Sequence, residues 1–174
     1  MFHDFKELLS VFNAHSVKYL VVGGYAVSFH AQPRATKDLD LFIKADRANA
    51  NAVYAALASF GAPLESISVE ELSDPRKFIR FGREPVAVDI LPSIDGVAFD
   101  EAWERRVEGV LDAASGLTAF FISKADLIAA KLAAGRTRDL ADVEDLREAQ
   151  TSQPERGQVG PSSDPTNGGP ASAT

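Results

Sequence analysis

The 174-residue sequence contains no cysteine, which excludes disulfide bonds, thiolate metal sites and a cysteine nucleophile together. It also lacks any apolar run approaching the roughly 20 residues that a membrane-spanning helix needs. Its first residues, Met1 to Glu7, lack the basic and then apolar pattern of a signal peptide. We therefore expect a soluble, cytoplasmic protein with no membrane partner.

Basic side chains are the scarcer charge, because 18 Lys and Arg stand against 25 Asp and Glu, giving a net charge of −7. Such a surface does not attract nucleic acid by bulk electrostatics, so we expect no coating of duplex DNA. A local basic pocket is compatible with the same overall charge. Apolar residues make up 45% of the chain and charged residues 25%, which is typical of a globular protein.

Large apolar side chains are almost missing from residues 151–174. Of these 24 positions, 15 are Gly, Pro, Ser or Thr, and Val159 is the one strong hydrophobe. Such a segment buries too little surface to offset the entropy of ordering it. We predict one folded domain over residues 1–150, followed by a disordered Gly/Pro/Ser/Thr-rich tail over residues 151–174.

Helical and strand patterns alternate along residues 1–150. The clearest helix boundaries are Asp46 with Gly61, and Ser123 with Gly135, as N-caps and C-terminal glycines. We expect helices near 2–12, 25–31, 46–60, 68–71, 99–103, 123–134 and 139–148, and strands near 19–22, 38–44, 77–81 and 86–91, with two more within 107–122. Residues 77–81 and 86–91 flank a turn and suggest a hairpin. This order predicts an α/β (α+β) protein with a small mixed sheet.

Polar and apolar side chains alternate along residues 34–43. If this segment is extended, one face carries the polar side chains of Arg34, Thr36, Asp38 and Asp40. Two carboxylates at i and i+2 of a strand lie roughly 6.5–7 Å apart, and their repulsion favours a bound cation. Hard divalent ions such as Mg²⁺ prefer carboxylate oxygens and bridge to phosphates. The alternative is a solvated edge strand with two outward aspartates.

Two further features stand near this strand. Gly23-Gly24 ends a short apolar run just before a predicted helix, where backbone amides can approach a phosphate. Asp89 interrupts the otherwise apolar strand 86–91, an environment in which a carboxylate needs a partner. We predict that Asp89 completes a metal site; a structural salt bridge to Arg34 is the alternative.

Taken together, Gly23-Gly24, the Asp38-x-Asp40 strand and the lone Asp89 resemble the DNA polymerase beta-type nucleotidyltransferase superfamily over about residues 17–145. The pattern is most similar to its small bacterial members, including those grouped with abortive-infection toxins of toxin-antitoxin systems. The resemblance implies a nucleotidyltransferase fold, a small mixed sheet flanked by helices. It implies an enzyme that moves a nucleoside monophosphate from an NTP, ATP among them, to an acceptor hydroxyl and releases pyrophosphate. The acceptor would be a tRNA, a protein or a small molecule such as an antibiotic.

The same resemblance makes Asp38, Asp40 and Asp89 the catalytic residues and the ligands of two Mg²⁺ ions, with Asp89 completing the ion that activates the acceptor. Two such ions stabilise the attacking and leaving oxygens of an in-line displacement at phosphorus. The nucleotide-binding candidates are Gly23, Gly24, Arg34, Thr36, Lys124 and Lys131. The two lysines lie seven residues apart and so share one face of the helix over 123–134. A solvated role for each lysine is the structural alternative.

Other functions are compatible with parts of this pattern. Tyr25 follows the glycine pair, where the superfamily often has Ser or Thr. This departure slightly favours a catalytically degenerate nucleotide-binding or toxin-antitoxin partner module of the same fold, whereas the three intact aspartates argue against it. A phosphohydrolase using an Asp nucleophile leaves the glycine pair without a role, and a glycosyltransferase normally needs a larger core. In the charged segment 135–142, we interpret the acids as structural partners of arginines.

Overall fold

The computed structural model describes residues 1–83 and 86–151, where helices and short strands alternate as the sequence predicts. The helices are α1 (His3–Ala14), α2 (Gly23–His30), α3 (Arg47–Phe60), α4 (Val69–Leu72), α5 (Phe99–Glu104), α6 (Lys124–Ala134) and α7 (Thr137–Thr151). The strands are β1 (Tyr19–Val21), β2 (Asp38–Ile43), β3 (Ile79–Arg83), β4 (Val86–Leu91), β5 (Val107–Asp112) and β6 (Leu117–Phe121). Beyond Thr151, the predicted tail lies outside the described residues. No helix in the described ranges is long and apolar enough to cross a membrane.

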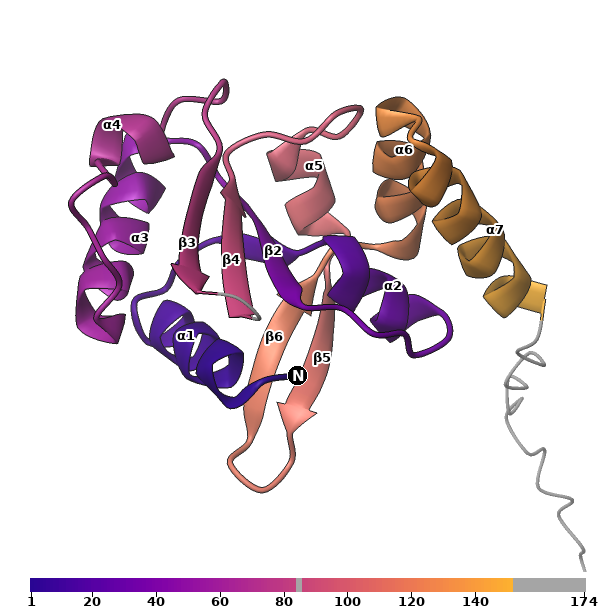
Figure 1. The fold of residues 1–174 in the computed structure, drawn as a ribbon, viewed down its shortest axis with the longest axis horizontal. Helices are drawn as coiled ribbons and strands as arrows, with labels where there is room; N and C mark the ends of the chain where they lie inside the picture. The colour runs from indigo at the N-terminus through magenta and orange to yellow at the C-terminus, as the bar shows by residue number, and fades with distance from the viewer. Residues whose placement is uncertain (84–85, 152–174) are drawn as a thin grey trace, which may run out of the picture.

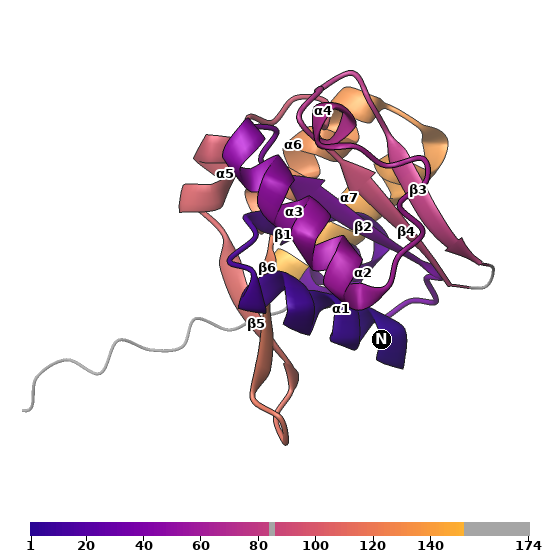
Figure 2. The same cartoon turned by 90° about the vertical axis from the view of Figure 1, so that its left-hand side faces the viewer.

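The strands form one six-stranded mixed sheet in the order β3-β4-β2-β1-β6-β5, which confirms the predicted fold class. The pairs β2/β4 and β1/β6 are parallel, and the other neighbours are antiparallel. Helices α1 and α3 cover one face of the sheet, and α6 and α7 lie on the other (Figures 1 and 2). The β5–β6 hairpin projects beyond the helices (Figure 1). Strand β2 therefore lies in the middle of the sheet, between both helical layers.

The main core lies between the sheet and the layer of α1 and α3. Helical spacing places Phe5, Leu8, Leu9 and Phe12 on one face of α1, and all four side chains are at most 1% exposed. Burying a side chain of this kind contributes about 1.5–3 kcal/mol relative to leaving it in water. This apolar layer fixes the back of the sheet, so the opposite face of β2 can carry polar groups.

The predicted helix boundaries are confirmed at α3 and α6. The Asp46 side chain accepts a hydrogen bond from the backbone N–H of Asn49, and the Ser123 side chain accepts one from that of Asp126. Gly61 and Gly135 end the same two helices in the left-handed conformation.

Two segments differ from the sequence expectation. Helix α2 begins at Gly23 rather than near Tyr25, so the glycine pair forms the first turn of the helix. The strand alternation begins at Asp38, and residues 34–37 are irregular. At Arg34 the backbone N–H donates to the Ser28 hydroxyl at 3.3 Å, so α2 anchors this segment instead of a neighbouring strand.

Candidate active site

The three aspartates selected from the sequence lie on the adjacent parallel strands β2 and β4. The strand register pairs Asp40 with Asp89 directly, and places Asp38 two residues earlier on β2. Leu39 and Leu41 are fully buried, whereas Asp38 and Asp40 are partly exposed. The alternation predicted for residues 34–43 is thus confirmed over residues 38–41 and not before them, and the register adds Asp89 to the same face of the sheet.

The pKa of the Asp40 carboxyl is strongly shifted by its surroundings. Burial raises its pKa from 3.8 to about 6, and the charges of Asp89 and Asp38 add to that rise. The backbone N–H of Gly24 donates a hydrogen bond to the carboxylate, which partly offsets the shift. A cation close to Asp40 therefore stabilises the ionised form of its carboxyl.

Gly23 makes close packing against Asp40 possible. Its φ of +59° lies in the left-handed region that favours glycine, and a Cβ at this position would overlap the Asp40 carboxylate. The Val22 backbone N–H donates to the Asp40 carbonyl oxygen at 3.0 Å. The N-terminus of α2, with its backbone N–H groups, therefore lies directly beside Asp40, an arrangement that favours a phosphate group near the carboxylate.

Asp89 is held by Arg80, a residue that the sequence analysis did not single out. The antiparallel register of β3 and β4 places Arg80 opposite Asp89. Arg80 Nη1 donates to Asp89 Oδ2 at 3.1 Å, and Arg80 Nη2 lies 3.3 Å from Asp38 Oδ2. Asp89 Oδ1 is buried and has no hydrogen-bond partner among the described residues. Burial raises the pKa of Asp89, Arg80 opposes that rise, and Asp38 adds to it.

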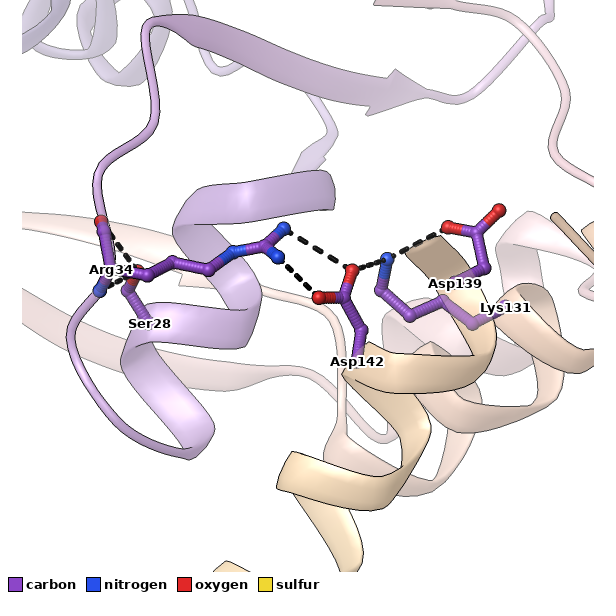
Figure 3. A network of polar contacts seen from close by, with 5 residues as sticks. All are labelled: Ser28, Arg34, Lys131, Asp139 and Asp142. Carbon is purple, nitrogen blue, oxygen red and sulfur yellow. Dashed lines mark hydrogen bonds and ion pairs between the residues drawn. The ribbon is translucent and has the colours of Figure 1, made fainter. Parts of the chain in front are cut away.

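The alternative partner for Asp89 was wrong, because Arg34 binds elsewhere. Both Arg34 amino groups donate to the carboxylate of Asp142 on α7 (Figure 3). Lys131 Nζ donates to Asp142 Oδ2 at 2.6 Å and to Asp139 Oδ1 at 3.0 Å. Arg136 Nε donates to the other Asp139 oxygen at 2.6 Å. This five-residue chain of charges, which we call the α6–α7 network, confirms that the acids of residues 135–142 pair structurally.

A cavity of about 760 Å³ lies between two of the three aspartates and the α6–α7 network, and Asp89 is not among its lining residues. Asp38 and Asp40 line it together with the glycine pair and Thr36. Its cations are Arg34, Lys37, Lys131, Arg136 and Arg138. A smaller cavity of about 220 Å³ adjoins it at Asp40 and is lined mainly by apolar side chains such as Leu91, Ile94 and Leu127. A chain of net charge −7 thus gathers basic groups beside its acidic ones.

Most of the predicted site residues meet at the larger cavity. The Thr36 side chain packs against Gly24 so closely that a Cβ there would lie 2.5 Å from Thr36 Oγ1. Lys131 reaches the cavity but is 8% exposed and bonded to two carboxylates. Lys124, at the start of α6, lines neither cavity. It lies close enough to His30 for its charge to contribute to the lowered pKa of that histidine, which burial mainly causes.

The donor set suits a hard divalent cation. All three candidate ligands are carboxylates, and Asp89 contributes a buried oxygen without a hydrogen-bond partner in the described ranges. Within residues 1–83 and 86–151, no three His, Asp or Glu side chains are gathered closely enough to hold a metal ion. The Arg80 guanidinium instead lies between the carboxylates of Asp38 and Asp89. The residues fit the ion in kind, and an arginine neutralises two of them.

Known proteins share this architecture. The lincosamide antibiotic adenylyltransferase LnuA with bound lincomycin is 18% identical, with a TM-score of 0.54 over 86% of this chain and 98% of that one. The antibiotic-resistance factor ANT(2'')-Ia is 14% identical, with a TM-score of 0.50 over 86% and 82% of the two chains. These similarities establish the fold. A search of curated proteins found no match.

A family model described as "Nucleotidyltransferase of unknown function (DUF6036)" matches residues 1–149. This range includes the glycine pair, all three aspartates and the α6–α7 network. The sequence resemblance is thereby confirmed at the level of the nucleotidyltransferase superfamily. The chain belongs to this nucleotidyltransferase family and is a nucleotidyltransferase enzyme.

Proposed function

We propose that this enzyme transfers a nucleoside monophosphate from an NTP to an acceptor hydroxyl in a Mg²⁺-dependent reaction. The observation that carries the proposal is the alignment of Asp38, Asp40 and Asp89 on one face of two adjacent parallel strands, where Asp38 and Asp40 line a cavity that also has cations in its lining. The acceptor oxygen attacks the α-phosphorus of the NTP, and the bond from that phosphorus to the β-phosphate oxygen breaks. Pyrophosphate leaves, and the hydroxyl proton passes to solvent.

The three aspartates are the residues that would hold two Mg²⁺ ions. Bound there, Mg²⁺ supplies positive charge for the triphosphate and the leaving pyrophosphate, and lowers the pKa of the acceptor hydroxyl. The Gly24 N–H keeps the Asp40 carboxylate oriented by a hydrogen bond. In the metal-free protein Arg80 donates to Asp89 Oδ2, and Asp89 Oδ1 is buried without a hydrogen-bond partner among the described residues. Little covalent chemistry is required of these side chains, so positioning and charge carry the catalysis.

The cations of the larger cavity are suited to the triphosphate. Lys37, Arg136 and Arg138 line the same cavity as Asp38 and Asp40. The first turn of α2 adds backbone N–H groups next to Asp40, the positive end of a helix dipole. We place the phosphates between these groups and the aspartates, where the arginines and the α2 terminus neutralise the charge that develops on the leaving group.

For the acceptor, a small-molecule hydroxyl is the first class to test. The structural neighbours are described as an antibiotic adenylyltransferase, with lincomycin bound, and as an antibiotic-resistance factor. ATP is accordingly the first donor. A tRNA end, a protein hydroxyl and the toxin-antitoxin role expected from the sequence are separate outcomes of the same assay.

The test combines each of four α-³²P-labelled NTPs with Mg²⁺ and either a panel of hydroxylated antibiotics or a cell extract containing tRNA and protein. A labelled product that forms only with Mg²⁺ supports the proposal and identifies the acceptor class. Tight NTP binding without transfer to any acceptor would instead support the degenerate module. Product formation that persists in EDTA would exclude the role of Mg²⁺.

The variant Asp89→Asn tests the catalytic role of the third carboxylate. We expect NTP binding to remain largely intact and turnover to fall by orders of magnitude, because the interaction is made mostly in the transition state. Asp100→Asn is the matched control, since Asp100 is exposed and lines neither of the two cavities. An Asp89→Asn protein with normal melting temperature and normal turnover would remove Asp89 from the catalytic set.

A further inference from the structure

We propose that Arg80 is a built-in counter-ion that competes with a divalent cation for Asp38 and Asp89, and thereby sets the metal affinity of the site. The inference rests on the proposed Mg²⁺ role of the three aspartates. It adds a residue that acts before any nucleotide binds. Arg80 would neutralise the carboxylates in the metal-free protein and release them when the ion enters.

The sheet places Arg80 for this competition. Antiparallel pairing sets Arg80 opposite Asp89, and parallel pairing sets Asp89 opposite Asp40. Three neighbouring strands therefore carry one cation and two carboxylates at the same level of the sheet. Arg80 comes from β3, the strand at the edge of the sheet next to β4.

The contacts of Arg80 use oxygens that a metal ion would need. Two different amino nitrogens reach two different carboxylates, at 3.1 Å to Asp89 Oδ2 and 3.3 Å to Asp38 Oδ2. A planar guanidinium suits this double contact, because its donors form a rigid fork. A metal bound to the same oxygens and Arg80 in this position exclude one another.

Exposure indicates which partner can move. The Arg80 side chain is 44% exposed, whereas the Asp89 side chain is 10% exposed. The arginine can therefore withdraw its head group into solvent on its flexible stem, while the carboxylate stays within the sheet. Because Asp89 Oδ1 is buried and is not hydrogen-bonded to any described group, a cation that displaces Arg80 from Oδ2 gains a second, unpaired oxygen of the same carboxylate.

In competition of this kind, the apparent Kd for the metal is its intrinsic Kd divided by the fraction of time for which Arg80 leaves the carboxylates open. If Arg80 occupies the carboxylates for about 70–90% of the time, its removal strengthens metal binding by about three- to tenfold. A purely supporting role predicts the opposite sign. An Asp89 carboxylate that needs Arg80 for its orientation would bind the ion more weakly once Arg80 is removed.

The experiment measures Mn²⁺ binding to the full chain without nucleotide, by the EPR signal of the unbound ion. We expect Arg80→Gln to bind Mn²⁺ about three- to tenfold more tightly than the unchanged protein. In EDTA its melting temperature should be lower than that of the unchanged protein, and saturating Mn²⁺ should narrow the difference. Arg76→Gln is the matched control, because Arg76 pairs with Asp74 on the exposed surface outside both cavities.

Two further variants separate the possible failures. Arg80→Lys keeps a positive charge for folding but loses the fork, and should bind Mn²⁺ with intermediate strength. Asp40→Asn should lose Mn²⁺ binding. If it does, and both Arg80 variants bind Mn²⁺ no more tightly than the unchanged protein, the counter-ion role is overturned while the metal site stands. If Asp40→Asn binds Mn²⁺ as the unchanged protein does, the proposed metal role falls together with this inference.

Discussion

Replacing Asp40 with asparagine probes the electrostatic strain of the site without any substrate. Burial, Asp89 and Asp38 together raise the pKa of Asp40 from 3.8 to about 6. At 1.36 kcal/mol per pKa unit, ionising this group in the folded state costs about 3 kcal/mol, which water at its partly exposed side reduces to about 1–3 kcal/mol. Asparagine has nearly the same shape, and its side-chain oxygen can still accept the Gly24 hydrogen bond. Asp40→Asn should therefore stabilise the metal-free protein at pH 8 by about 1–3 kcal/mol.

The pH dependence follows from the direction of the pKa shift. Because the folded pKa lies above the unfolded one, the folded protein keeps the Asp40 proton between about pH 4 and 6, where the unfolded chain has lost it. The stability that this proton contributes is complete below about pH 4 and is lost as the pH rises through about 6. The gain from Asp40→Asn should accordingly be small near pH 4 and complete above pH 7.

Urea denaturation in EDTA, near pH 4 and at pH 8, measures the free energy of unfolding of the unchanged protein and of Asp40→Asn. Asp100→Asn, at an exposed carboxylate that pairs with Lys44, should not show this rise in stability with pH. An Asp40→Asn protein that is no more stable than the unchanged protein at pH 8 would refute the reasoning, as would a gain of equal size at both pH values.

Two other predictions concern the frame around the aspartates. Gly23→Ala should lower the free energy of unfolding by more than the 1 kcal/mol or so expected for a left-handed backbone alone, because the new Cβ meets Asp40. Gly61→Ala is its control, since Gly61 also has a positive φ but has open space around it; equal losses in the two variants would contradict the close approach at Gly23. Lys131→Met should cost about 3 kcal/mol, because it leaves two buried carboxylates, Asp139 and Asp142, without their shared ammonium. Lys124→Met on the same helix should change stability by less than about 0.5 kcal/mol. Chemical denaturation measures each, and matching losses in the two lysine variants would show that the α6–α7 network contributes little.

Local patterns were enough to select the residues at the centre of the candidate site. The period of two along β2 places Asp38 and Asp40 on one face because Leu39 and Leu41 must be buried on the other. The lone Asp89 could be selected because a carboxylate in an apolar strand needs a partner. Its partner was harder to predict, since Arg80 is opposite Asp89 only in the strand register that pairs Arg83 with Val86.

Contacts between distant segments could not be predicted from local patterns. Arg34 and Asp142 are 108 residues apart, and no spacing rule connects a loop after α2 with the face of α7. The start of α2 at Gly23 is another case, because glycine has a low helix propensity. Its positive φ and its contact with Asp40 depend on β2, which follows later in the chain.

The long-range pairing of Arg34 with Asp142 also bears on the order in which the enzyme matures during translation. The glycine pair, Asp38, Asp40 and Asp89 all precede α6, but the carboxylates that hold Arg34 and Lys131 belong to α7. At about 5–20 residues per second, a ribosome needs roughly 5–20 s to translate the 108 residues from Arg34 to Asp142. During this interval the nascent chain carries the aspartates without α7, the helix whose carboxylates hold Arg34 and Lys131 at the larger cavity. These cations are fixed in place only when α7 has left the ribosome, so the growing chain has its aspartates well before the basic side of the cavity is complete.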